Sequence, residues 1–341
     1  MSWDALNAAV AQSRALIASR APDAATAAEG EAYITRVAAA GLGGAVLGHL
    51  LQEDGLGRPL PVYGGPNPDY IMRHAGIDPT LRYRLEGRIN GSERVGVGLY
   101  KPRPRGGTPV EVGYTSFSRS DCDSEGCFAL ELSPDATGTG SGTLALPPDV
   151  RILLVRILHR DPACEPARLR LTGAPPARGL ALVMGSNDAA LAFAARTLGT
   201  NVREYLRWTE AAQEHANRFA TAPPELAEAV QGDPDTQYFL GYYDLADGEL
   251  LIVTMPKGIG GYWSLHAYDH WFQHLQTPGV HDRNATIGSD GRFHITVGPS
   301  SSSAVGNHVD TLGRRKGALI CRVIGAPQLD PPEADLARAK Q

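Results

Sequence analysis

The chain lacks the segments that mark a membrane or secreted protein. Its N-terminus, MSWDALNAAVAQSRALIASR, carries charges throughout and has no apolar core of a secretory signal. No stretch approaches the roughly 20 apolar residues that a membrane span requires. The default expectation is therefore a cytoplasmic protein that contacts no membrane.

Cysteine is also scarce, with four among 341 residues, and none of the spacings is that of a zinc knuckle. Cys122 and Cys127 flank a short DSEG turn and are close enough in sequence to pair. A reducing cytoplasm favours free thiols, so the sequence leaves a Cys122–Cys127 disulfide as the alternative.

Signals for nucleic acids and nucleotides are missing as well. The net charge is −5 and the pI is about 6.1, whereas a nucleic-acid partner calls for a basic face. The glycines of GLGGAVLG at 41–48 lack the Lys-Ser/Thr of a P-loop and a preceding strand, so they predict close helix packing. No glycine-rich strand–turn–helix fingerprint is present, and we expect no cofactor.

The composition is that of a soluble globular protein, with 43% hydrophobic and 20% charged residues. Residues 1–57 predict a helical segment, with helices over about 3–20 and 25–51. From residue 58 the pattern changes to short alternating runs such as RYRLEGRI (82–89) and RVGVGLYK (94–101), with Asn90-Gly91 as a hairpin turn between them.

These runs predict an α+β, mainly β fold: an antiparallel jelly-roll-like β-sandwich with an N-terminal helical segment and a helical insertion. We expect the sandwich domain to cover residues 58–325, the insertion to lie at about 188–230, and residues 326–341 to form a tail. There is no internal repeat at a solenoid period.

The stretch YWSLHAYDHWFQH, from Tyr262 to His274, concentrates aromatic and proton-handling side chains. Read with period two, it predicts a strand with an oily face that contains Trp263. Its other face carries Ser264, His266 and Tyr268. We expect this second face to open into a cavity of the sandwich.

Three segments resemble the bacterial proteins grouped as domain of unknown function 1214, which often accompany domain of unknown function 1254. They are NPDYIMRHAGIDPTLRYRLEGRI (67–89), YWSLHAYDHW (262–271) and GNHVDTLGRRKGALICRVIG (306–325). His308 departs from the Trp of the family pattern and Lys316 from its Glu. The resemblance implies a jelly-roll-like β domain and an oligomer, and it implies no defined activity.

His266, Tyr268 and Asp269 are the first candidate catalytic residues. Histidine changes charge near neutrality, which suits a general acid or base, and a tyrosine can donate to a developing oxyanion. Asp269 would orient an imidazole or act as a base. The alternative is that His266 is a hydrogen-bonded sheet histidine and Tyr268 a packing residue.

A second polar cluster follows near residue 310. Asn307 and Asp310 are candidate catalytic residues there, and His308 is a candidate binding residue, because loops on a rigid sheet often carry binding groups. The alternative is turn chemistry, with Asp310 capping backbone amides.

The remaining candidates would bind the substrate or a metal. Trp263 and Trp271 would shape the cavity, Tyr242 would form an aromatic wall or simply part of the core, and Arg283 and Asn284 would supply donors. His270 and His274 have the i, i+4 spacing of a metal pair. Since no HExxH pattern surrounds them, we favour no metal.

The first functional hypothesis is a cofactor-independent acid/base enzyme, a lyase, isomerase or hydrolase, acting on a small, largely apolar or cyclic molecule. The alternatives are a non-catalytic sugar- or lipid-binding or assembly module and a metal-dependent jelly-roll enzyme. In each case we expect a small-molecule ligand and a homo-oligomer, with no nucleic acid.

Overall fold

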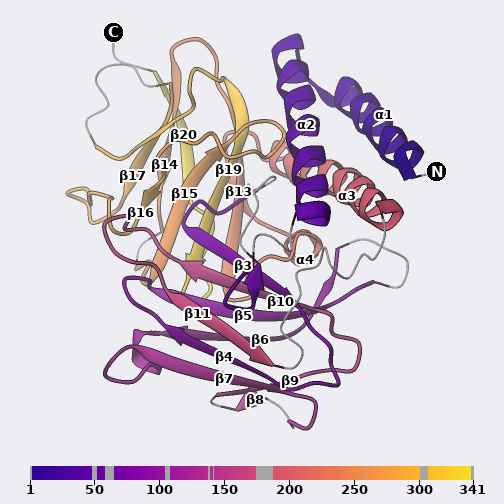
Figure 1. The fold of residues 1–341 in the computed structure, drawn as a ribbon. Coiled ribbons are helices and arrows are strands. Elements are labelled where there is room, and N and C mark those ends of the chain that lie inside the picture. Colours follow the sequence, from indigo (N-terminus) through magenta and orange to yellow (C-terminus); the bar gives the residue numbers. More distant parts are fainter. Residues whose placement is uncertain are drawn as a thin grey trace. The chain divides into compact units, whose positions relative to one another are not determined.

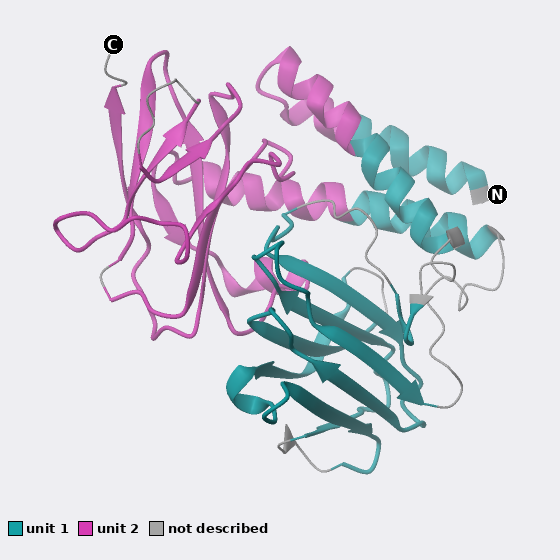
Figure 2. Ribbon diagram, turned by 60° about the vertical axis from the view of Figure 1, so that its left-hand side comes forward, with its two compact units in different colours: residues 1–15, 34–200 teal, residues 16–33, 201–341 magenta. Residues whose placement is uncertain are grey.

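The computed structural model describes residues 2–47, 52–57, 65–103, 108–136, 139–140, 142–173, 187–256, 258–299 and 306–338. They fall into two compact units, which Figure 2 shows in different colours. Unit 1 comprises residues 1–15 and 34–200, and unit 2 comprises residues 16–33 and 201–341. Among the described residues, no helix is long and apolar enough to cross a membrane.

Three long helices begin in one unit and end in the other: α1 (Ser2–Arg20), α2 (Ala24–Leu47) and α3 (Asn187–Gln213). Asp4 in the first turn of α1 and Arg20 in its last turn complement the helix dipole. Within unit 1, α2 and α3 approach closely at Gly41, where a Cβ atom would lie 3.2 Å from the Cα of Ala194. Close helix packing, predicted for the glycines of 41–48, is thus present at Gly41, while Gly48 lies outside the described residues.

Unit 1 contains two sheets that share one core (Figure 1). Sheet A has the order β1-β2-β3-β10-β5-β6 and sheet B the order β11-β4-β7-β9-β8. The strands are β1 (Gln52–Glu53), β2 (Leu56–Gly57), β3 (Tyr70–Gly76), β4 (Tyr83–Arg88), β5 (Arg94–Lys101), β6 (Val110–Ser118), β7 (Cys127–Ser133), β8 (Thr139–Gly140), β9 (Thr143–Ala145), β10 (Ile152–Leu158) and β11 (Arg168–Gly173).

Alternation along the strands builds this core. Leu85 on β4 and Leu130 on β7 face Val97 on β5 and Val155 on β10, and all four are fully buried. The prediction of a hairpin at Asn90-Gly91 is wrong, because β4 and β5 belong to different sheets. Asn90 does have the positive φ of a turn residue. The turn carries the chain from sheet B to sheet A, because both flanking strands then turn their apolar faces toward one core.

Unit 2 also contains two sheets around one core. Sheet C has the order β12-β13-β19-β15-β16 and sheet D the order β18-β17-β14-β20. The short helix α4 (Pro224–Ala229) precedes most of these strands. The strands are β12 (Phe219–Thr221), β13 (Thr236–Asp244), β14 (Glu249–Thr254), β15 (Tyr262–Tyr268), β16 (Val280–His281), β17 (His294–Gly298), β18 (His308–Asp310), β19 (Lys316–Ile324) and β20 (Glu333–Arg338).

The two units repeat one sheet topology. The order β3-β10-β5-β6 in sheet A matches β13-β19-β15-β16 in sheet C, and β11-β4-β7-β9 in sheet B matches β20-β14-β17-β18 in sheet D. Corresponding strands follow each other in the same order along the chain, and the described strands outside this match are β1, β2 and β8 in unit 1 and β12 in unit 2. Even the parallel pair recurs, as β7–β9 in unit 1 and β17–β18 in unit 2. The chain therefore contains an internal structural repeat.

A buried arginine–tyrosine pair occupies the same register in both units. In unit 1, Arg156 on β10 lies opposite Gly96 of β5, and Tyr100 follows Gly96 by four residues. In unit 2, Arg322 on β19 lies opposite Ser264 of β15, and Tyr268 follows Ser264 by four residues. Arg156 donates to the Tyr100 hydroxyl over 3.0 Å, and Arg322 donates to the Tyr268 hydroxyl over 2.8 Å. The guanidinium carbons lie 5.9 and 5.7 Å from the respective ring centres.

The fold class predicted from sequence is confirmed: the chain is α+β and mainly β, with an N-terminal helical segment. The predicted domain division differs from the observed one, because residues 58–325 contribute to two compact units and not to one sandwich. The insertion corresponds to α3, β12 and α4. The expected tail contains strand β20, which pairs with β14 and forms one edge of sheet D.

Removing residues 331–341 should destabilise unit 2. The deletion takes away β20 and leaves one edge of β14 unpaired, which we expect to cost on the order of 1–3 kcal/mol of local unfolding free energy. Hydrogen exchange of the amides of Leu250 to Val253 measures it. A chain that ends at Arg338 is the control and should exchange like the full chain; equal protection in both truncations would show that β20 adds no stability.

Candidate functional site

Strand β15 has the two faces that its sequence predicts. Trp263, Leu265 and Ala267 point into the core between sheets C and D. Tyr268 belongs to a different cluster, on the outer face of sheet C, which includes Trp208 of α3 and Leu226 of α4. The polar side of β15 therefore does not face the interior of the sandwich, because apolar side chains fill that interior.

His266, His274 and Tyr268 form a continuous row of rings on this outer face. The rings of His266 and His274 have centroids 5.4 Å apart, and those of Tyr268 and His274 are 5.6 Å apart. His266 is 2% exposed and Tyr268 is fully buried. The structure thus brings together two residues that the sequence placed on one strand face and a third from the following turn.

Arg322 brings a permanent positive charge to the end of this row. Its guanidinium is 3% exposed and donates to the Tyr268 hydroxyl. Burial works against that charge, but the phenols of Tyr268, Tyr262 and Tyr238 favour it, and the pKa of Arg322 is raised. Any negative charge that develops on the oxygen of Tyr268 is stabilised by this contact.

Asp269 holds the turn that carries His270 and His274. Its carboxylate accepts hydrogen bonds from the backbone N–H groups of Trp271 and Gln273, each over 2.9 Å, and from Nε2 of Gln273 over 2.7 Å. Burial raises the pKa of Asp269 to about 6, although these donors act in the opposite direction. Asp269 could act as the predicted base only if its carboxylate were not engaged in these hydrogen bonds of the turn.

Tyr242 and His270 form a second pair on the same sheet. The Tyr242 hydroxyl lies 2.9 Å from Nδ1 of His270, and burial lowers the pKa of this histidine. Trp271 points elsewhere: its indole N–H donates to the carbonyl of Thr26 over 2.8 Å, and its ring packs against Gly30 of α2. Trp271 therefore packs against the part of α2 that belongs to unit 2.

Asn284 is bonded to the backbone segment that lies against His266. Its amide donates to the carbonyl of Gly279 over 3.0 Å and accepts from the N–H of His281 over 2.7 Å. Gly279 lies against the imidazole of His266, since a Cβ atom there would be 2.2 Å from Nδ1. The neighbouring Arg283 donates its backbone N–H to Nδ1 of His281.

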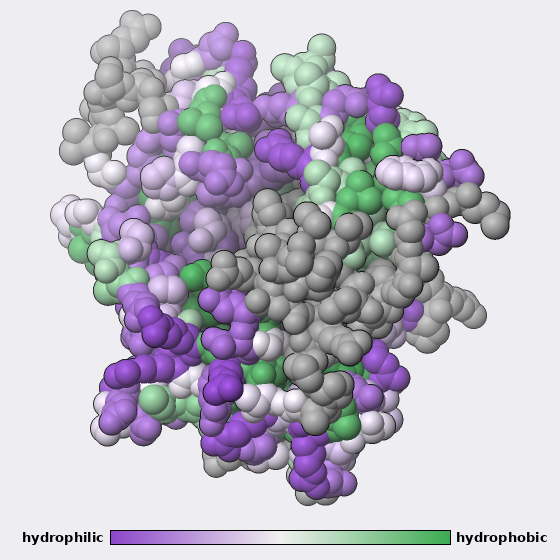
Figure 3. Space-filling model, viewed as in Figure 1, coloured by the Kyte–Doolittle hydropathy of each residue, from purple (hydrophilic) through white to green (hydrophobic). Residues whose placement is uncertain are grey.

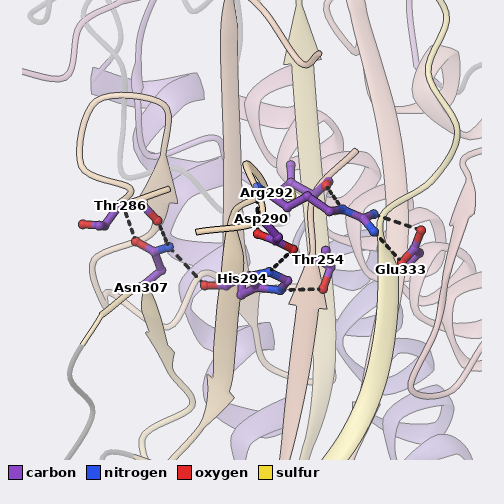
Figure 4. A network of polar contacts seen from close by, with 8 residues as sticks. Thr254, Thr286, Asp290, Arg292, His294, Asn307 and Glu333 are labelled. Atoms are coloured by element: carbon purple, nitrogen blue, oxygen red, sulfur yellow. Dashed lines mark hydrogen bonds and ion pairs between the residues drawn. The ribbon is translucent and has the colours of Figure 1, made fainter. Parts of the chain in front are cut away.

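The second predicted cluster belongs to sheet D, not to sheet C. Asn307 bridges two segments, donating to the carbonyls of Thr286 and His294 and accepting from the N–H of Thr286 (Figure 4). Asp310 accepts from the N–H of Leu312 in a tight turn, which is the turn chemistry considered above. His308 contacts the carbonyl of Gly298. These contacts of Asn307, Asp310 and His308 lie within sheet D and the loops next to it.

Figure 4 also shows a hydroxyl–imidazole–carboxylate line on sheet D. Oγ1 of Thr254 lies 3.0 Å from Nδ1 of His294, and Nε2 of His294 lies 2.9 Å from Asp290. The order is that of a hydrolase triad, yet the side chains of His294 and Asp290 are 44% and 49% exposed. In that setting the line ties the Asp290-Gly291 turn to β14.

Within the described parts of the chain, no group of three or more His, Cys, Asp or Glu side chains is arranged to hold a metal ion. His270 and His274, the predicted weak metal pair, contact different aromatic neighbours: Tyr242 and Trp271 for His270, and His266 and Tyr268 for His274. Cys122 and Cys127 are free thiols.

Arg322 is the member of the site that sequence reasoning missed. It sits in ALICRVI, which reads as a plain core strand. The available signal was the similar run ILLVRIL at 152–158, where Arg156 interrupts an apolar strand in the same way.

The fold and the site define a class of protein with two repeated β-sandwich units and a buried polar row on one of them. Residues 214–339 match a family described as a protein of unknown function (DUF1254). This is the companion family named in the sequence analysis, and the match includes the ring row and Arg322.

A solved structure shows the same architecture. An uncharacterized protein of Burkholderia cenocepacia has a TM-score of 0.81 and 23% identity, over 99% of this chain and 96% of that chain. The VPA0106 protein of Vibrio parahaemolyticus has a TM-score of 0.48 and 13% identity, over 90% of this chain and all of that one. No curated protein matches the chain.

Replacing Asp269 by Asn should change how stability depends on pH. Because the folded state raises the pKa of Asp269 from 3.8 to about 6, folding favours the protonated carboxyl. Its stabilising effect is complete below pH 4 and is lost as the pH rises through 6.

Relative to the Asp269→Asn variant, the wild type should therefore lose up to about 3 kcal/mol of unfolding free energy between pH 4 and pH 7. Thermal and urea unfolding of both proteins at matched ionic strength measure this difference. A difference that stays constant over this range would mean that Asp269 is ionised throughout.

Proposed function

We propose that the outer face of sheet C is an acid/base site, and that the protein is a cofactor-independent lyase, isomerase or hydrolase for a small, largely apolar or cyclic molecule. His266 is the general acid or base, and His274, in ring contact with it, is its partner. Tyr268, held by Arg322, is the donor to the oxygen on which negative charge develops.

One observation carries this proposal: the repeat supplies an internal comparison. The positions in unit 1 that correspond to Ser264 and His266 are Gly96 and Gly98, while the Tyr and Arg of the pair are the same in both units. The arginine–tyrosine pair is thus common to both folds, and the imidazoles are specific to unit 2. A group that the fold does not require is the better candidate for chemistry.

In this assignment Asn284 is a positioning residue, because it fixes the Gly279 segment against His266. Asp269 positions the turn that carries His274. Trp263 supports β15 from the sandwich core and does not line the site. Asn307 and Asp310, engaged in sheet D, are not part of the proposed machinery.

We also propose, from the residues quoted for the resemblance, that the chain is related to domain of unknown function 1214 and that it assembles into a homo-oligomer. The match to the companion family supports the first statement. Light scattering of the purified protein tests the second, and a mass of one chain would contradict it.

The test is turnover by matched variants. Wild-type protein is incubated in D2O with a library of cyclic and apolar carbonyl compounds and alcohols, and mass spectrometry detects deuterium uptake or conversion. His266→Asn and Tyr268→Phe should each reduce turnover by about 100-fold or more, because they remove general acid/base or polarising groups.

Tyr100→Phe is the matched control, since it removes the equivalent hydroxyl in unit 1, and it should turn over like the wild type. Circular dichroism checks that each variant is folded. Full turnover in both the His266 and the Tyr268 variants would remove the assignment.

A further inference from the structure

The outer face of sheet B in unit 1 carries an open depression of about 510 Å³. It is lined by side chains of β4, β7 and β11 and by the turn between β1 and β2. Many of the side chains over this sheet are hydrophilic in Figure 3. Its lining contains four arginines, Arg84, Arg88, Arg168 and Arg170.

Two of these arginines face each other at one end of the sheet, and a third lies near them. Arg168 lies directly opposite Arg88, and Arg170 lies directly opposite Glu86. Like charges directly opposite each other destabilise an antiparallel pair. A negatively charged ligand that contacts both guanidinium groups removes that repulsion.

Two of the acidic groups in the lining already have partners within the fold. Arg84 is bound to Glu86 and Glu131 on the same face. Asp123 accepts from the backbone N–H groups of Glu125 and Cys127.

The arginines at that end keep donors for a ligand. Arg88 uses Nε to reach the carbonyl of Glu125, and Arg168 contacts Glu165 at the edge. Each guanidinium has five N–H donors, so donors remain on both. Asp54, on the β1–β2 turn, is the remaining acidic group of the lining.

We propose that this depression is a binding site for a small oxyanion, a phosphate or carboxylate group, held by Arg88, Arg168 and Arg170. The planar fork of a guanidinium matches both oxyanions through paired N–H···O bonds. The site lies in unit 1 and is independent of the acid/base assignment in unit 2.

The test is calorimetric titration of the full chain with two probes, inorganic phosphate and succinate, at constant ionic strength. Saturable binding of either probe is expected, and the two arms distinguish phosphate from carboxylate. Arg88→Gln, Arg168→Gln and Arg170→Gln should each weaken binding roughly tenfold, because each removes charge-assisted hydrogen bonds.

Arg84→Gln is the matched control. It removes the same charge from the same face, but from an arginine already paired with two glutamates, and it should leave the affinity within about twofold. Asp54→Asn should tighten binding by a few-fold, since it removes repulsion. Equal weakening by all four arginine variants would show attraction by net charge alone, and no saturable binding of either probe would overturn the site.

Discussion

A guanidinium buried against a phenol is the interaction on which both units depend. Arg156 and Arg322 are almost completely buried, in the middle of apolar strands at the centre of their sheets. An arginine cannot shed its charge in a protein, so a buried one has to be supplied with acceptors. Tyr100 and Tyr268 supply an oxygen and a ring face, and both occupy the same strand register relative to their arginine.

The same arginine–tyrosine pair has different neighbours in the two units, because equivalent positions of the strand carry different residues. In unit 1, Gly96 and Gly98 leave space that the side chains of Tyr114 and Tyr100 fill. Arg94, at the end of the same strand, donates to the Tyr114 hydroxyl. In unit 2 the equivalent positions carry Ser264 and His266, and the turn held by Asp269 adds His274. One scaffold therefore supports a tyrosine–arginine cluster in one unit and a histidine-containing row in the other.

Local features of the sequence predicted much of this fold. Alternation gave the strands and the two faces of β15, and the N-terminal helices follow their apolar and alanine-rich patterns. Sequence could not say which sheet each strand joins. Asn90-Gly91 forms a turn, but the burial of Leu85 and Val97 against each other decides that the chain crosses between sheets.

The repeat escaped the sequence for a similar reason. Arg156 and Arg322 are 166 residues apart, and the short runs around them share little beyond an arginine between apolar residues. Only strand pairing shows that they are equivalent. Part of the candidate site could be predicted, because His266 and Tyr268 lie on one face of a single strand. The association of His274 and Arg322 with them could not, because it depends on the turn after β15 and on the neighbouring strand β19.

The most direct test of this account is a pair of double-mutant cycles. One combines Arg322→Met with Tyr268→Phe, and the other Arg156→Met with Tyr100→Phe, with local unfolding free energies taken from hydrogen exchange of amides in sheets C and A. We predict coupling energies of about 1.5–3 kcal/mol in both cycles, the range of hydrogen bonds to charged groups. Coupling below about 0.5 kcal/mol in either cycle, the level at which separate sites are additive, would contradict the claim that one buried interaction organises both units.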